Sequence, residues 1–176
     1  MSERPSYLGL LNAIAVAEGQ AEQFLNCWAA TTPNDAVRKV IATVALREGE
    51  HAKAFEKRIC ELGYEMRPGE ADEEKLEIAA SAELTDRQKF ERLGLGERND
   101  GPDVFSRMFD DKTIDIQTGA LLGRYIAEER DSGRLLADCY EQLCECEPES
   151  DDDAVLDDVV ARLERIEKKI RKLSKR

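Results

Sequence analysis

The stretch IATVALREGEHAKAFEKRICELGY, residues 41–64, decides the fold class. Its apolar residues recur at steps of three and four, which is the spacing of an α-helix with one buried face. They are Ile41, Val44, Phe55, Ile59 and Leu62. Asn34 or Asp35 can cap this helix, and Gly63 can stop it. The pattern therefore predicts a helix over about residues 34–62.

Polar residues interrupt this apolar face at its middle. Glu48 and His51 stand where the pattern expects apolar residues, and both project from the same side of the helix because they are three residues apart. A second helix, predicted over residues 6–30 with Ser6 as its N-cap, has a similar interruption at Glu18. Burying a carboxylate without a partner is costly. These acids therefore need basic partners, water or a metal ion.

The positions of proline divide the remaining chain into helical segments. Prolines stand at 5, 33, 68, 102 and 148, and the segments between them are rich in helix formers. No segment alternates apolar and polar residues long enough to indicate a strand. The chain is therefore predicted to be all-α, with an up-down four-helix bundle over residues 1–147. An amphipathic helix over 148–176 would serve oligomerisation or docking.

The sequence allows more than one set of limits for the third and fourth helices. The third would begin at Asp72, and Ser81 and Thr85 could break it into two short helices. The fourth would begin between Pro102 and Thr113 and run to about Cys144.

Composition narrows the classes of function. Charged residues make up 36% of the chain, and the formal net charge is -12, which disfavours binding to nucleic acid or to an anionic membrane surface. The hydrophobic fraction of 41% is enough for a core, but no apolar run is long enough to span a membrane. Five cysteines form no paired framework, which indicates a cytoplasmic location. The roles of Cys144 and Cys146 stay open.

The interrupting residues fit metal coordination. Hard metal ions take carboxylate oxygens, and imidazole suits iron and zinc. Carboxylate sites for two iron or manganese ions in four-helix bundles use single Glu residues from two helices and a Glu-x-x-His pair from each of the others. Glu18 matches the first type, and Glu48 with His51 matches the second. His51 is also the single histidine of the chain.

The chain resembles rubrerythrin-type proteins of the ferritin-like superfamily. The resemblance rests on AEGQA around Glu18, on EGEH at residues 48–51, and on RYIAEERDSGRLL at 124–136. It covers about residues 7–146 and is weakest between 70 and 112. It implies a ferritin-like four-helix bundle that holds a carboxylate-bridged dimetal centre. Glu128 would supply a fourth metal ligand beside Glu18, Glu48 and His51.

The chain departs from the family pattern at several positions. Asp131 replaces the second histidine, and Glu129 lies nearer the centre of the apolar face, so either residue is an alternative ligand. The third-helix carboxylate could be Glu83, Asp86 or Glu91. The chain also lacks the two CxxC pairs of a rubredoxin-like iron domain.

From the resemblance we expect a metal-binding protein with iron, manganese or zinc as cofactor, at one or two ions per chain. Its chemistry would be that of a nonhaem diiron or dimanganese oxidase or peroxidase that reacts with oxygen or peroxide, with no catalytic residue assigned. We also expect a homo-oligomer and an external electron donor.

The alternative is a non-enzymatic helical interaction protein with a vestigial metal site. In that case, basic residues such as Arg124 or Arg134 would pair with the buried acids.

Overall fold

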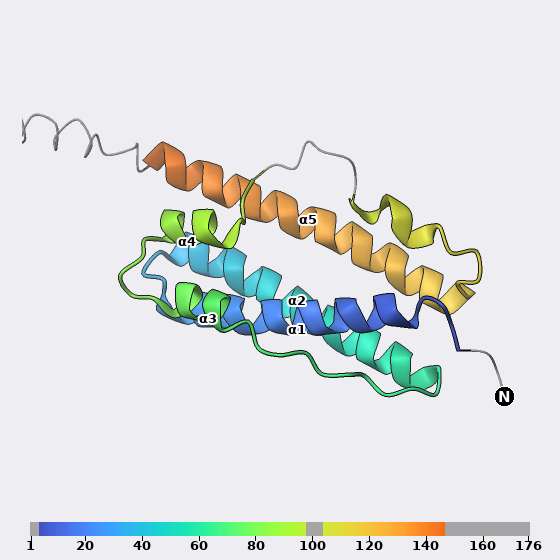
Figure 1. Ribbon diagram of the computed structural model, residues 1–176. Coiled ribbons are helices and arrows are strands. Elements are labelled where there is room, and N and C mark those ends of the chain that lie inside the picture. Colours follow the sequence, from blue (N-terminus) through green and yellow to red (C-terminus); the bar gives the residue numbers. More distant parts are fainter. Residues whose placement is uncertain (1–3, 98–103, 147–176) are drawn as a thin grey trace, which may run out of the picture. The chain divides into compact units, whose positions relative to one another are not determined.

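The computed structural model describes residues 4–97 and 104–146, and every regular element in these ranges is helical (Figure 1). The elements are α1 (Leu8–Thr31), α2 (Asp35–Glu61), α3 (Glu73–Ala80), α4 (Asp86–Leu93), the 3-10 helix η1 (Val104–Phe109) and α5 (Ile116–Cys146). The prediction of an all-α class is confirmed for the described residues. None of the described helices is both long and apolar enough to cross a bilayer.

The chain divides into two compact units, residues 1–142 and 143–176. The core and the candidate site lie in the first unit. The C-terminal helix predicted over 148–176 lies outside the described residues.

Local capping sets the ends of α2, but it does not set the start of α1. The Asn34 side chain accepts hydrogen bonds from the backbone N–H groups of Ala36 and Val37, as expected for the N-cap of α2. After α2, Gly63 adopts a φ of 82°, which favours glycine. Helix α1 was predicted to begin at about Ser6 with Ser6 as its N-cap, but Tyr7 occupies the N-cap position. The Ser6 hydroxyl instead donates to the Asp111 carboxylate and lies within hydrogen-bond distance of the Thr113 hydroxyl, and α1 begins at Leu8.

The third segment consists of two short helices. Helix α3 ends at Ala80 because Ser81 is extended. Helix α4 then begins under a capping box in which Thr85 and Gln88 each accept a hydrogen bond from the other's backbone N–H. The break that Ser81 and Thr85 allowed in the sequence is therefore present.

Helix α5 begins later than predicted. We expected a start between Pro102 and Thr113, but η1 and a turn precede the first residue, Ile116. Asp115 explains this start, because its side chain accepts hydrogen bonds from the backbone N–H groups of Gln117 and Thr118.

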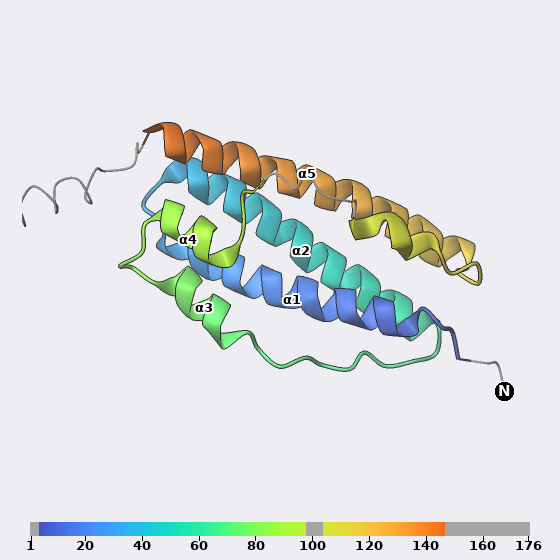
Figure 2. The same ribbon diagram turned by 45° about the horizontal axis from the view of Figure 1, so that its top comes forward.

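The connection between α2 and α3 runs back along α1. Helices α1 and α2 lie side by side in opposite directions (Figures 1 and 2). The following segment then returns over α1, where Asn12 exchanges two hydrogen bonds with the backbone of Arg67, and Gln20 donates to the backbone carbonyl of Glu70. Helix α3 therefore packs on α1, near the end of α1 at Thr31. The predicted up-down arrangement did not include this long connection.

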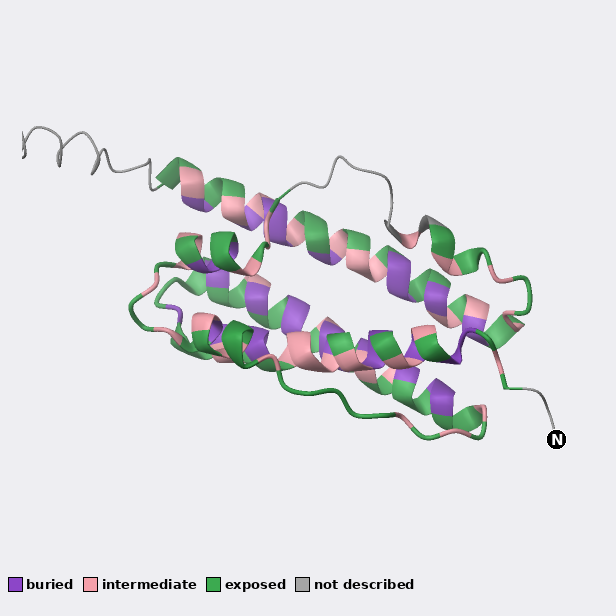
Figure 3. Ribbon diagram, in the orientation of Figure 1, coloured by how far each residue is buried: buried purple, intermediate pink, exposed green. Residues whose placement is uncertain are grey.

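Apolar layers lie on both sides of the mid-helix polar residues. The buried faces of α1, α2 and α5 turn toward one another within the first unit (Figure 3). One layer contains Leu8, Leu11, Phe55, Ile59, Leu122 and Ile126. Toward the other end of α1, Trp28 meets Phe90 edge to face, with ring centroids 4.7 Å apart. This packing fixes the rotation of the helices, and with it the direction of the polar side chains between the layers.

We expect Asp115→Ala to destabilise the fold by about 2–3 kcal/mol, since it removes a helix cap and one of the two carboxylate partners of the buried Arg58. Asp115 accepts hydrogen bonds from Tyr7 at 2.7 Å and from the buried Arg58 at 2.9 Å. Burial alone would raise the pKa of Asp115, but its bonds to Thr118, Tyr7 and Arg58 outweigh burial and lower it.

A carboxyl with a lowered pKa contributes stability above the unfolded pKa, and that stability is lost as the pH falls. Urea unfolding at pH 7 and at pH 3 measures both effects. The exposed Asp110→Ala is the control, and a loss for Asp115→Ala no larger than for Asp110→Ala would contradict the assignment.

Candidate metal site

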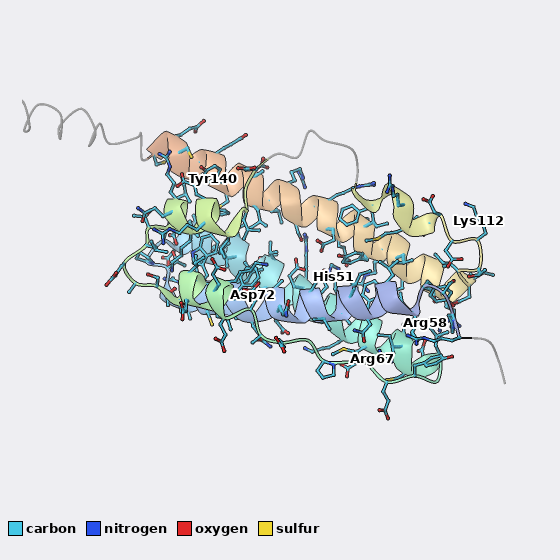
Figure 4. The ribbon with its side chains drawn as sticks, in the orientation of Figure 1. His51, Arg58, Arg67, Asp72, Lys112 and Tyr140 are labelled. Carbon is cyan, nitrogen blue, oxygen red and sulfur yellow. The ribbon has the colours of Figure 1, made fainter. Side chains whose placement is uncertain are left out.

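Three long helices bring four side chains together near their midpoints. Glu18 comes from α1, Glu48 and His51 come from α2, and Glu129 comes from α5. One oxygen or nitrogen atom from each lies within 4.8 Å of the others. The exposed fractions of Glu18, Glu48 and His51 are only 6%, 6% and 3%. Figure 4 shows His51 among the long helices.

Three atoms in this cluster that could bind a metal ion are buried and have no hydrogen-bond partner. They are Oε2 of Glu18, Nδ1 of His51 and Oε1 of Glu129. The His51 Nδ1 lies 3.3 Å from the Glu129 oxygen and 3.7 Å from the Glu18 oxygen, so the three atoms face one another. Buried polar atoms are usually paired, and leaving them unpaired costs stability. A cation bound among them would satisfy all three, so these residues fit a metal ion.

Burial and neighbouring charges shift the pKa values of the cluster residues. Burial, together with the adjacent Glu18 carboxylate, raises the pKa of Glu48 to about 10. Burial would lower the pKa of His51, but the surrounding carboxylates of Glu129, Glu18 and Glu128 outweigh it and raise that pKa to about 10. Burial would raise the pKa of Glu18, yet its interactions with His51 and Glu48 lower it. Without a bound cation, Glu48 and His51 would therefore keep protons at a pH where the same groups in an unfolded chain release them.

Arginine and lysine do not balance the charge of the cluster. Within the described ranges, no ion pair joins Glu18, Glu48 or Glu129 to either residue type. Arg124 pairs with Glu128 and Glu50, and its side chain is 63% exposed. Arg134 pairs with Asp131. The basic partners that the interaction-protein alternative requires are therefore not found there.

Glu128, the ligand expected from α5, lies on the other side of His51. Its Oε2 is 2.8 Å from His51 Nε2, while Glu129 reaches the Nδ1 side. Asp131, the replacement for the second histidine, pairs with Arg47 at 2.9 Å and with Arg134. Of the two alternatives that the sequence left open, Glu129 is the one that joins the cluster.

The acids of the third segment lie elsewhere. Asp86 accepts hydrogen bonds from Trp28 Nε1 at 2.7 Å and from Thr32 Oγ1 at 2.6 Å. Glu91 pairs with Arg87 and accepts a bond from the Tyr140 hydroxyl, and Glu83 is exposed. None of these three acids belongs to the four-residue cluster.

Tyr125 is a further residue of the site that was not among the residues expected from the sequence. Its hydroxyl donates to Glu18 Oε1 at 2.8 Å, and its ring meets that of His51 edge to face at 5.1 Å. Burial raises the pKa of Tyr125. The signal in the sequence was its position one helical turn before Glu129.

A cavity of about 390 Å³ adjoins the cluster between α2 and α5. Its lining combines the rings of His51 and Tyr125 with charged residues of both helices. The residues are Glu50, His51, Lys53, Ala54, Leu121, Arg124 and Tyr125.

Comparison with known proteins finds no matching family model, no matching curated protein and no matching solved structure.

Proposed function

We propose that this protein binds one iron or manganese ion per chain and that the metal reacts with oxygen or peroxide. The ligands would be Glu18, Glu48, His51 and Glu129. The observation that carries this proposal is the convergence of two carboxylate oxygens and one imidazole nitrogen that are buried and have no hydrogen-bond partner. Three carboxylates and one imidazole suit iron and manganese better than zinc, which most often takes histidine and cysteine in tetrahedral sites.

We further propose that the fold is a ferritin-like four-helix bundle of the rubrerythrin type. The antiparallel pair α1 and α2, the long connection back along α1, and ligands at mid-helix support this assignment. Two features favour one ion over the two that the family holds. Asp131 faces arginines, and the described acids of the third segment lie away from the cluster.

The chain's own residues would prepare the site for this chemistry. A bound iron or manganese ion would supply electron transfer to oxygen or peroxide. Apolar layers exclude bulk water, and the cavity beside His51 and Tyr125 has room for a small oxidant. The Tyr125 hydroxyl donates a hydrogen bond to Glu18 Oε1, which orients that carboxylate with Oε2 toward His51. An external electron donor and a homo-oligomer remain part of the proposal.

Anaerobic calorimetric titration with Mn²⁺ and Fe²⁺ tests metal binding. We expect about one ion per chain in the wild-type protein, and loss of binding in Glu18→Gln, because a buried carboxylate ligand is removed. Glu22→Gln is a matched control. It removes the same charge one turn further along α1, and Glu22 is not part of the cluster. Wild-type protein that binds neither ion would leave the non-enzymatic interaction protein as the better hypothesis.

The redox part of the proposal needs a separate assay. Protein loaded with Fe²⁺ is mixed with oxygen or hydrogen peroxide, and iron oxidation is followed by absorbance. We expect the wild-type protein to oxidise iron faster than Glu18→Gln at the same total iron. Equal rates would show that the site binds metal without promoting its oxidation.

A further inference from the structure

The two ring nitrogens of His51 meet different surroundings. Nδ1 points to the buried side, where the free oxygens of Glu18 and Glu129 lie. Nε2 points to Glu128, whose Oε2 lies 2.8 Å away and forms a hydrogen bond. The ring thus has one satisfied nitrogen and one unsatisfied nitrogen.

The hydrogen bond to Glu128 decides which nitrogen can bind a metal. A carboxylate only accepts, so Nε2 must carry the proton of this bond. In the neutral ring, the lone pair then resides on Nδ1. That lone pair faces the two carboxylate oxygens that have no hydrogen-bond partner. The imidazole therefore presents its metal-binding nitrogen to the cluster.

Glu128 is itself held in place from α5. Arg124 lies one turn earlier, and its Nε donates to Glu128 Oε1 at 3.0 Å, while Nη2 lies 3.6 Å from Glu50. Both oxygens of Glu128 are therefore engaged, one by His51 and one by Arg124. The Glu128 side chain is 31% exposed, and it lies on the opposite side of the imidazole from the three unpartnered atoms.

We propose that Glu128 is a positioning residue, held by Arg124, that directs Nδ1 of His51 to the metal and does not itself bind the ion. This inference rests on the proposed metal site, and it assigns Glu128 a role different from the ligand role that the resemblance implies. Carboxylates that accept a hydrogen bond from the outer nitrogen of a metal-binding histidine fix its tautomer and orientation. Their loss weakens metal binding by roughly 10–100-fold.

The single histidine makes this proposal directly measurable. Full-length protein labelled with ¹⁵N-histidine gives signals from one imidazole only, and ¹¹³Cd²⁺ serves as the metal probe. We expect a scalar coupling between ¹¹³Cd and Nδ1 of His51, with a proton retained on Nε2. Coupling of ¹¹³Cd to Nε2 would overturn the proposal while leaving the metal site standing. A wild-type protein that binds neither Cd²⁺ nor Mn²⁺ would overturn the metal site as well.

Variants separate positioning from general structural support. In Glu128→Ala we expect Cd²⁺ affinity to fall about 10–100-fold, with ¹¹³Cd still coupled to Nδ1 and a faster exchange of the Nε2 proton with solvent. Glu128→Gln keeps an acceptor oxygen and should recover part of the affinity. Asp131→Asn is the matched control, since it removes a charge one turn away on α5 without touching His51, and its affinity should stay within about twofold. Unchanged Cd²⁺ affinity in Glu128→Ala would overturn the proposal.

Discussion

Glu48→Met should abolish metal binding and also make the metal-free protein more stable. Glu48 is 6% exposed, and burial beside the Glu18 carboxylate holds it in its protonated form. Burying a carboxyl group costs desolvation free energy even when it is protonated, and apolar replacements of similar volume in buried polar clusters are often stabilising by about 1–4 kcal/mol. We therefore expect a gain of about 1–2 kcal/mol in the free energy of unfolding, measured with urea in the presence of a chelator.

Added metal should reverse this order of stability. A ligand that binds only the folded state stabilises it by about 2.7 kcal/mol at 100 times its dissociation constant. With Mn²⁺ at that level, the wild-type protein should therefore unfold at higher urea than Glu48→Met. The exposed Glu56→Met, two turns further along α2, is the control and should change neither curve by more than about 0.5 kcal/mol. If Glu48→Met instead destabilises the metal-free protein, Glu48 stabilises the fold. That result would contradict the view that Glu48 lowers the stability of the fold in exchange for metal binding.

The second large effect is a loss of metal-free stability with rising pH. The pKa values of both Glu48 and His51 are raised to about 10 in the folded state. Between about pH 7 and 10 the folded protein therefore retains protons that the unfolded chain releases. The stability from each group is complete below its unfolded pKa and is lost as the pH rises through the folded value. The free energy of unfolding should thus fall across this window.

Metal binding should show the opposite trend. Metal ligands must be deprotonated, so the ion competes with the protons on Glu48 and His51, and affinity should increase with pH. Unfolding of the wild-type protein with chelator at pH 7, 8 and 9, compared with Glu48→Met, measures the first trend. A wild-type slope no steeper than that of the variant would contradict the assignment of a proton to Glu48.

Helical periodicity made much of the site predictable. Glu18, Glu48 and His51 each interrupt an apolar face, and buried faces of neighbouring helices meet at a common axis. The same pattern, with the Asn34 cap, predicted α2 to within one residue at each end. These features are local, and the structure places all three side chains in one cluster.

The remaining features depend on contacts between distant residues. Glu128 and Glu129 differ by about 100° around α5, and the packing of Tyr125 against Glu18 selects which of them faces the cluster. Asp86 could not be separated from the other third-segment acids in the sequence, because its partners Trp28 and Thr32 lie more than 50 residues away.

The start of α5 is a further case of this kind. Asp115 caps the helix and also binds Arg58 from α2, which is a contact that no local pattern reports.

Elemental analysis of the purified, untagged protein, grown with iron, manganese and zinc available, is the most direct test of the metal site. The comparison is the double variant Glu48→Ala, His51→Ala, prepared in the same way. We expect about one iron or manganese ion per wild-type chain and none in the variant, because the variant lacks two of the four proposed ligands. A wild-type protein without metal, with the same thermal stability as the double variant, would contradict the metal site and the chemistry proposed for it.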